Sequence, residues 1–527
     1  MNSYHSIINN IRELPPQNAN MALPPLLLSY LPTLLVVLAL LSSLLLAGRK
    51  ARGGSATWKL PPGPPKLPVI GHLHLLGSSL LHRSLCELSK IHGPLMHLKL
   101  GRVPVVVVSS PEMAKEVLKI HDLECCSRPS LLSLSKFSYG LSDVAFIPYG
   151  ERWRQLRKFC TVELFSTRKI NSFRDIRREE MERVTKLICS HARASTTVNL
   201  SELLLSLSCN MTCRTAFGSG FDDGSDIQLH DMLREAQAAL GGLFLSDYLP
   251  LLGWVDRLSG MRSRLERAYL KLDTIYQRRI DHHQDRLRQQ GKEDGDVLDA
   301  LLRMQKDEEG LTEDHIKGVL MNIFIAGTDT SSATVEWAMA ELIRQPELMK
   351  RAQDEVRGCV GSKGEVEESD LHQLHFFKCV IKETMRLHPP APLLLPRETM
   401  QHFKLNGYDI LPKTWMYVNA WAIGRDPNSW GRPHVFDPER FMHDSMEANG
   451  QDFKLIPFGE GRRICPGKNL GMLMVELVLA NRLYSFDWHL PPGMVKEDIS
   501  MEEAPGITVH REYALCLMAT KYDASTA

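Results

Sequence analysis

The stretch PFGEGRRICPG, Pro457 to Gly467, decides how the rest of the chain is interpreted. A single cysteine, Cys465, follows two glycines and two arginines and stands directly before a proline and a further glycine. Glycines allow tight turns and a close approach of the backbone to another group, and Pro466 has no N–H to offer beside the cysteine. The stretch therefore predicts a constrained loop that presents one thiol.

The residues after this loop form a helix-like run, LGMLMVELVLANRL, which begins at Leu470. Unpaired backbone N–H groups and the helix dipole stabilise a thiolate near a helix N-terminus, and the neighbouring arginines add positive charge. Taken alone, Cys465 could equally be a buried structural cysteine beside a basic surface loop. The density of the surrounding pattern favours a thiolate that binds another group.

The composition excludes several classes of protein. With 527 residues, 43% of them hydrophobic, the chain can bury a large core. A net charge of +1 gives no global indication of a nucleic-acid partner. The eleven cysteines are scattered without the spacing of a disulfide framework or a zinc site, which predicts free thiols in a reducing compartment.

An apolar segment stands near the N-terminus. Residues 21–47 hold no charged side chain and Leu26–Ala47 is long enough to cross a bilayer, so we expect a transmembrane anchor over residues 21–48. The basic residues that follow favour a cytosolic position for the rest of the chain. A cleaved signal peptide is the alternative, although the apolar run is long and its positive charges follow it. Residues 1–20 form a polar extension, and both Met1 and Met21 could be the start.

After the anchor, residues 49–71 form a basic and proline-rich hinge, because the prolines of LPPGPPKLP exclude a helix. Residues 72–520 begin with two predicted strands within His97–Ser110 and continue mainly as segments with apolar residues at helical spacing. No repeat or second composition regime interrupts them. The predicted fold class is therefore mainly α with a small β part in one large domain, and residues 521–527 form a tail. The shorter predicted helices are Glu112–Leu118, Trp153–Leu164, Arg177–Ala192, Leu265–Arg288 and Glu347–Val356.

The longest predicted helix begins after Thr312, a suitable N-cap, and ends at Gln345, where Pro346 stops it. Its length is roughly 45 Å, the width of a whole domain. Its centre, Val319–Ala340, is mostly apolar. We therefore expect this helix to run through the core.

The cysteine loop resembles the haem-binding signature of the cytochromes P450, which Phe458, Gly461, Arg463, Cys465 and Gly467 match. In that family the cysteine thiolate is the axial ligand of the iron, where it pushes electron density onto the metal. The resemblance implies haem b as the cofactor and Cys465 as the metal ligand. It further implies that Arg463 pairs with a haem propionate and that Phe458 packs against the ring.

The centre of the longest helix contains AGTDTS, Ala326–Ser331, which is similar to the oxygen-activation segment of that family. Ala326 and Gly327 have almost no side chain, so a flat cofactor and O2 could lie against the helix. Asp329 and Thr330 would relay protons. A small-residue patch for helix packing is the alternative interpretation.

Two further motifs follow in family order. Glu383 and Arg386 lie one helical turn apart in KETMRLHPP, and the later FDPERF supplies Arg440. By resemblance the three form the buried ion-pair triad of the P450 fold. This triad is structural, because leaving one of its charges unpaired would strongly destabilise the protein.

Three more residues match family positions near the haem propionates. Trp153 and Arg157 lie one turn apart in ERWRQLRK, and arginine suits the recognition of a carboxylate by two hydrogen bonds. Arg397 follows PPAPLLLP. We expect no ligand role for His388, which precedes the same segment.

The resemblance covers Leu60–Thr520, and its motifs are most similar to plant endoplasmic-reticulum P450s of the A-type, 71-clan-like group. It implies a monooxygenase that uses O2 and electrons from NADPH. Because the chain has no flavin or nicotinamide fingerprint, the implied partner is NADPH-cytochrome P450 reductase, with cytochrome b5 as an additional one. The predicted location is the endoplasmic-reticulum membrane, in a single pass with the catalytic domain in the cytosol. The basic residues expected to dock the reductase are Arg154, Lys158, Arg432, Arg462 and Lys468.

The substrate pocket is predicted from family position, with Phe146, Leu393, Leu394 and Ile507 among its walls. These walls imply a lipophilic substrate of modest size, such as a terpenoid, a phenylpropanoid, an alkaloid or an indole-derived compound. The substrate and the position attacked stay open. Two alternative functions also stay open: a protein of this fold that rearranges peroxides, and a non-catalytic haem-binding protein. Asp329 and Thr330 weigh against both.

Overall fold

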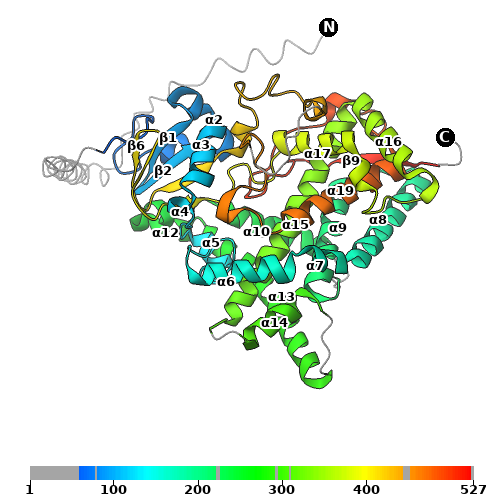
Figure 1. The fold of residues 1–527 in the computed structure, drawn as a ribbon, viewed down its shortest axis with the longest axis horizontal. Helices are drawn as coiled ribbons and strands as arrows, with labels where there is room; N and C mark the ends of the chain where they lie inside the picture. The colour runs from blue at the N-terminus through cyan, green and yellow to red at the C-terminus, as the bar shows by residue number, and fades with distance from the viewer. Residues whose placement is uncertain are drawn as a thin grey trace, which may run out of the picture. The chain divides into compact units, whose positions relative to one another are not determined.

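One long helix, α15 (Glu313–Arg344), runs through the middle of the structure (Figure 1). Thr312 caps it, and the His315 side chain completes the cap by accepting a hydrogen bond from the Thr312 backbone N–H. The helix packs against α9 (Leu200–Phe217), α17 (His375–Leu387) and α19 (Lys468–Ser485). The predicted core-spanning helix is confirmed.

The computed structural model describes residues 58–77, 80–220, 226–290, 295–307, 310–442 and 452–523. The predicted extension over residues 1–20, the anchor over residues 21–48 and the hinge up to residue 57 lie outside the described residues, as does the tail from residue 524. Within the described ranges no single helix has the length and composition to cross a bilayer. One helix pair, Met232–Tyr248 and Pro250–Leu258, meets the criteria together but is bent by 114°.

The two halves of α15 belong to different apolar clusters. Val319, Leu320 and Phe324 pack in one cluster, whereas Val335 and Met339 pack in another with α8, α9, α17 and α19. The segment Ala326–Ser332 belongs to neither cluster. The two apolar clusters therefore hold α15 at both ends. The small and polar side chains at its centre are not needed for this packing and can form part of a functional site.

The remaining α-helices surround this axis. They are α2 (Leu81–His92), α3 (Pro111–Lys115), α4 (Asp122–Cys125), α5 (Leu132–Phe137), α6 (Glu151–Phe159), α7 (Thr167–Ser172), α8 (Arg174–Ala194), α10 (Asp226–Leu240), α11 (Leu245–Tyr248), α12 (Gly253–Leu258), α13 (Met261–Gln290), α14 (Val297–Asp307), α16 (Pro346–Val360) and α18 (Ala420–Ile423). Two π-helical turns, Glu116–Ile120 and Cys160–Leu164, continue α3 and α6. Single 3₁₀ turns lie at Leu73–Leu75, Pro250–Leu252, Gly361–Lys363, Leu371–Gln373, Pro438–Phe441, Gly461–Arg463 and Lys496–Asp498.

The strands form three small sheets. The four-stranded sheet has the order β1 (Leu95–Leu100), β2 (Val103–Val108), β7 (Trp415–Val418), β4 (Arg397–Glu398). The β2–β7 pair is parallel and the other two pairs are antiparallel. The second sheet has the order β3 (Val198–Asn199), β9 (Cys516–Lys521), β8 (Phe486–His489), and β5 (Phe403–Leu405) pairs with β6 (Tyr408–Ile410). The two predicted strands are confirmed as β1 and β2, and β4 carries Arg397.

Candidate active site

A cavity of about 370 Å³ lies between the centre of α15 and the cysteine loop. Helices α9, α10 and α19 supply further walls, including Thr212, Leu240 and Met474. Among the predicted site residues, those that line it are Phe146, Arg157, Ala326, Gly327, Thr330, Leu394, Arg397, Phe458, Arg463, Cys465, Gly467 and Ile507. The fold thus brings most of the predicted residues to one cavity, although they are spread over more than 350 positions of the sequence.

Four predicted residues do not line the cavity. Trp153 packs against the Arg463 guanidinium, Gly461 lies close to the Leu118 backbone, and Asp329 pairs with His510. Leu393 packs against the apolar cluster that contains Met96 and Trp415. The backbone reverses at Leu394, whose φ is 52°, so consecutive leucines of this segment reach different sides. The prediction that Leu393 forms a pocket wall is therefore wrong.

The cysteine loop is a tight structure. The Cys465 backbone N–H donates to the Phe458 carbonyl over 3.0 Å, and α19 begins at Lys468. Gly461 has a φ of 76°, and a Cβ there would lie 2.1 Å from the Leu118 carbonyl oxygen, so no other residue fits. Gly467 has an ordinary φ of −89°, so its backbone conformation does not require a glycine.

Protein surrounds Cys465 closely, but its side chain is exposed to the cavity because the cysteine lies on the cavity wall. Burial raises the pKa of its thiol, while the Gly467 backbone N–H and the charges of Arg157 and Lys468 lower it. A thiol in this position needs a bound cation to become a stable thiolate, and thiolates are strong metal ligands.

Five arginines line the same cavity: Arg128, Arg157, Arg177, Arg397 and Arg463. Arg177 is paired with Glu368. The Arg463 guanidinium donates to the carbonyls of Cys126, Val144 and Ile147, and it lies 4.5 Å from the centre of the Trp153 ring. Burial lowers the pKa of Arg463 to about 10, which still leaves the side chain charged at neutral pH.

Arg397 is held in place by two contacts. Its Nη1 donates to Asp122 over 2.6 Å, and its Nη2 donates to the Glu460 carbonyl over 2.8 Å. Burial also lowers the pKa of Arg157, although the nearby Cys465 acts in the opposite direction and raises it. The sequence analysis missed Arg128, which is buried and donates to the carbonyls of Ala145, Leu395 and Pro396. The residues around Arg128, SRP, match none of the sequence motifs described above.

This donor set fits haem b, which has an iron that accepts a thiolate and two anionic propionates. The cavity wall contains two cysteines, Cys160 and Cys465, and five arginines, and Cys465 is the one in the cysteine loop. The Trp153 Nε1–H is buried and has no partner within the described residues, so a further acceptor would satisfy it. Ala326 and Gly327 leave the face of α15 flat enough for a planar group.

Asp329 lies one residue before Thr330 but turns away from the cavity. Its Oδ1 lies 2.8 Å from His510 Nε2, and its Oδ2 is buried without a partner in the described part of the chain. The Thr330 hydroxyl donates to the Ala326 carbonyl over 2.7 Å. His510 precedes β9 and had no signal in the sequence, because only the fold brings it to α15.

Burial lowers the pKa of His510, but Asp329 and Glu336 outweigh this effect and raise it above its ordinary value. Arg234 on α10 acts in the opposite direction. The His510 side chain is 26% exposed, whereas that of Asp329 is 4% exposed. His510 is therefore the more accessible member of the pair.

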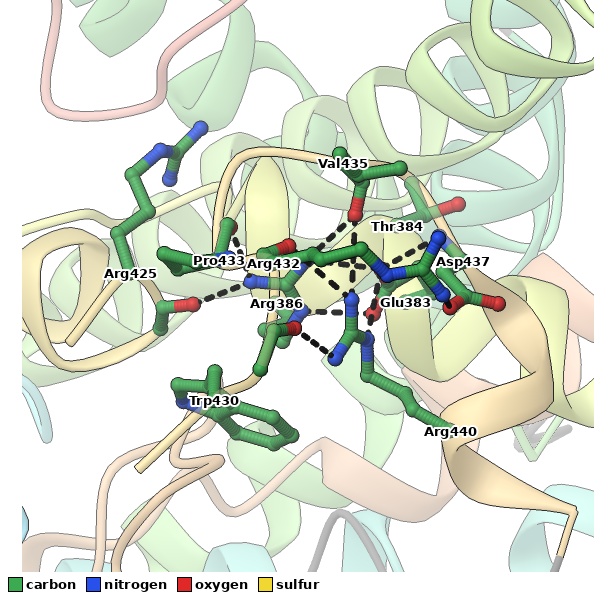
Figure 2. A network of polar contacts seen from close by, with 12 residues as sticks. Glu383, Thr384, Arg386, Arg425, Trp430, Arg432, Pro433, Val435, Asp437 and Arg440 are labelled. Atoms are coloured by element: carbon green, nitrogen blue, oxygen red, sulfur yellow. Dashed lines mark hydrogen bonds and ion pairs between the residues drawn. The ribbon is translucent and has the colours of Figure 1, made fainter. Parts of the chain in front are cut away.

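Glu383 lies between Arg386 and Arg440, as Figure 2 shows. Arg386 makes two hydrogen bonds to its carboxylate, of 2.6 and 2.7 Å, and Arg440 makes one of 3.0 Å. The Trp430 ring lies 5.3 Å from the Arg386 guanidinium. The side chains of Glu383 and Arg386 are completely buried, so the network ties α17 to the 3₁₀ turn Pro438–Phe441.

His388 has a structural environment. Its ring stacks on Trp337 at 4.1 Å, and its Nε2 lies 2.8 Å from Glu341 Oε1. It is not among the residues that line the cavity.

The chain belongs to the cytochrome P450 family, because the family model "Cytochrome P450" matches residues 61–517. It is similar to cytochrome P450 71B10 of Arabidopsis thaliana, with 47% identity over 92% of this chain and 98% of the relative. Cytochrome P450 71A9 of Glycine max is 49% identical over 88% and 93% of the two chains. Strychnine-11-hydroxylase of Strychnos nux-vomica is 46% identical over 90% and 94%.

Two solved zebra fish cytochrome P450 structures, one with abiraterone and one with progesterone, match with TM-scores of 0.69 and 0.70. Their identities to this chain are 26% and 27%, and each match covers 84% of this chain and 99% of the other. The fold is therefore the cytochrome P450 fold. The chain is a plant 71-type P450 monooxygenase whose cofactor is haem b, and it uses O2 and electrons that a reductase takes from NADPH. This favours a monooxygenase over the peroxide-rearranging and non-catalytic alternatives.

Proposed function

We propose that this protein is a membrane-anchored monooxygenase that oxidises a small lipophilic plant metabolite at the cavity between α15 and the cysteine loop. One observation carries this proposal. The same cavity contains the Cys465 thiol, five arginines and the Thr330 side of α15, and the rest of its wall is largely apolar. A site of this kind holds a charged cofactor at one end and an uncharged molecule at the other.

Cys465 is the proposed metal ligand. Arg157, Arg397 and Arg463, together with Arg128, would bind the two propionates, and the buried Trp153 Nε1–H would donate to the same groups. Phe458, Gly461 and Gly467 would shape the loop under the ring, and Ala326 and Gly327 would leave room above it. Haem held by a cysteine thiolate activates O2 so that one oxygen atom can be inserted into a substrate.

Protons would reach the site along a short path in this chain. His510 would pass a proton from its Nε2 to Asp329 Oδ1, and rotation of the resulting neutral carboxyl group would turn that O–H toward water near Thr330. Asp329 Oδ2 has no partner within the described residues that would oppose this rotation. Thr330 lines the cavity and would hold the receiving water with its hydroxyl. Asp329 and Thr330 are thus the proposed catalytic pair, and His510 supplies Asp329.

The substrate class is proposed from the walls and from one relative. Phe146, Leu394 and Ile507 contribute apolar surface to the cavity. A chain named strychnine-11-hydroxylase is 46% identical to this one. These points support an alkaloid, or a terpenoid, phenylpropanoid or indole-derived compound of similar size.

The location and partners are proposed from the sequence. The apolar residues 21–48 would anchor the chain in the endoplasmic-reticulum membrane, with the catalytic domain in the cytosol. The electron donor would be NADPH-cytochrome P450 reductase, with cytochrome b5 as a second partner. Of the basic residues proposed for docking, Arg154, Arg432 and Arg462 have carboxylate neighbours, which reduces the attraction expected from these three.

A screen of lipophilic metabolites tests the proposal. Purified protein with haem should bind at least one compound with a shift of the haem spin state, and that compound should be oxygenated when the reductase and NADPH are present. Compounds that shift the spectrum but are never oxygenated under these conditions would contradict the proposed function.

A further inference from the structure

Gln237, on α10, is an unusual part of the cavity wall. Its side chain lines the cavity and is 6% exposed. Both the amide nitrogen Nε2 and the amide oxygen Oε1 are buried, and neither has a hydrogen-bond partner within the described residues. Buried polar groups normally have partners, because burying an amide without one costs free energy. A glutamine with both ends unpaired therefore calls for a partner that is not part of this chain.

Other polar residues on the same wall are already engaged. Asn322 accepts from the backbone N–H groups of Val144 and Ala145 and donates to Asp143. The hydroxyls of Thr330 and Thr334 each donate to a backbone carbonyl of α15. Among the described lining residues, Gln237 is the one side chain with both its donor and its acceptor buried and unpaired.

The surroundings of Gln237 narrow the chemistry of the missing partner. Leu240 follows on the same helix and lines the cavity, as do Phe146, Ile323 and Ile507. A molecule that fills this region must be mostly apolar. The amide carries no charge and offers both a donor and an acceptor, so it pairs best with an uncharged hydroxyl or carbonyl.

We propose that the Gln237 amide anchors the substrate through a neutral hydroxyl or carbonyl group, so that the substrate is an oxygenated lipophile and not a hydrocarbon. This inference rests on the proposed function, whose substrate class it narrows. The anchor also selects an orientation, because a molecule held at α10 presents another part of its skeleton to the rest of the cavity, where Thr330 and Cys465 lie.

The first test needs no substrate. Gln237→Met keeps the size of the side chain and removes the unpaired amide, so Tm of the haem-containing protein should stay the same or rise by about 1–3 °C. Gln353→Met is the matched control, because Gln353 is 7% exposed and donates to the Phe486 carbonyl over 3.0 Å. The control should lower Tm. A comparable fall in Tm for Gln237→Met would mean that the amide has a partner within the fold, and the proposal would be overturned.

The second test uses probes with one skeleton and different oxygen content: bornane, borneol and camphor, each compared with any compound that the metabolite screen finds. Binding is followed both by the haem spectrum and by the rise of Tm on adding ligand. Wild-type protein should bind oxygenated members about tenfold more tightly than the hydrocarbon, and Gln237→Met should lose that preference. An unchanged preference in the variant, or no preference in the wild type, would overturn the proposal. Loss of turnover with the preference intact would count against the proposed function alone.

Discussion

At the scale of single residues, the site depends on groups whose charges need a partner from outside the chain. Cys465 presents a thiol on the cavity wall, and burial disfavours its charged form. Arg463 and Arg397 are fixed by hydrogen bonds to carbonyls and to Asp122, so their remaining donors are preorganised toward the cavity. Preorganised donors bind an anion with little loss of side-chain entropy. The hydrogen bonds to carbonyls and to Asp122 also explain how several arginines can lie close together around one cavity.

Thr330→Ala should uncouple the consumption of NADPH from the formation of product. The threonine hydroxyl is proposed to hold the water that receives the proton, and without it reduced oxygen would be released unproductively. We expect product per NADPH to fall about tenfold or more. Thr334→Ala is the control, because Thr334 lines the cavity one turn further along α15 and should stay nearly coupled. Full coupling in Thr330→Ala would remove the hydroxyl from the mechanism.

His510→Gln tests the proton path through a pH profile. The folded protein raises the pKa of His510, so the stabilisation from protonated His510 is complete below about pH 6.5 and is lost as the pH rises through the folded pKa. The charged groups that face His510 are Asp329, Glu336 and Arg234. The difference in Tm between the wild type and His510→Gln should therefore be larger at pH 6 than at pH 9. The coupling of NADPH consumption to product formation in the wild type should fall over the same rise in pH. If the wild type and His510→Gln had the same pH profile of Tm and the same pH profile of coupling, the proposed role of His510 would be contradicted.

At the scale of elements, α15 shows how the site is supported. Apolar clusters hold the helix on either side of Ala326–Ser332, so a segment with small and polar residues survives in its middle without weakening the core. The network of Glu383, Arg386 and Arg440 ties α17 to the 3₁₀ turn that precedes the cysteine loop in the sequence. The apolar clusters and the ion-pair network position these elements without contributing to the chemistry directly.

Glu383→Gln should destabilise the protein by about 3–5 kcal/mol, because it leaves the completely buried Arg386 without its counter-charge. Glu439→Gln is the matched control. Glu439 pairs with Arg351 on the surface, and an exposed pair contributes at most about 1 kcal/mol. Denaturant unfolding followed by haem absorption measures both. Equal, small losses of stability in the two variants would show that the buried network is dispensable.

The sequence predicts elements well where one side is polar, as in α8 and α13, where apolar residues recur at helical spacing. It missed α9 because that helix packs against α15 and buries serine, cysteine and threonine along with leucine, which erases the periodic pattern. In the site, motifs predicted Cys465 and Arg463. Arg128, Gln237 and His510 could not be predicted, because only the tertiary fold brings them to the cavity or to Asp329.

At the scale of the whole molecule, residues Lys59–Ala527 form one compact unit that contains every residue proposed for the site. The proposed anchor precedes this unit in the sequence. Attachment to the membrane and assembly of the haem site should therefore be separable.

Removal of residues 1–57 should release the protein from membranes and leave its haem content unchanged, since the compact unit stays intact. The full chain, which keeps the apolar residues 21–48, should resist extraction by alkaline carbonate and serves as the control. Extraction followed by haem quantification measures both properties. A truncated protein that stays membrane-integral would place the anchor elsewhere, and the bent pair Met232–Tyr248 and Pro250–Leu258 would be the first segment to test.

The most direct test of the central claim is the absorption spectrum of the reduced, carbon-monoxide-bound protein after Cys465→Ser. Loss of the sulfur ligand should shift the band away from its wild-type position, because the axial ligand sets the electronic state of the iron. Cys160→Ser, which changes another cysteine on the wall of the same cavity, should leave the band in place. A band that stays at the wild-type position in Cys465→Ser would contradict the account.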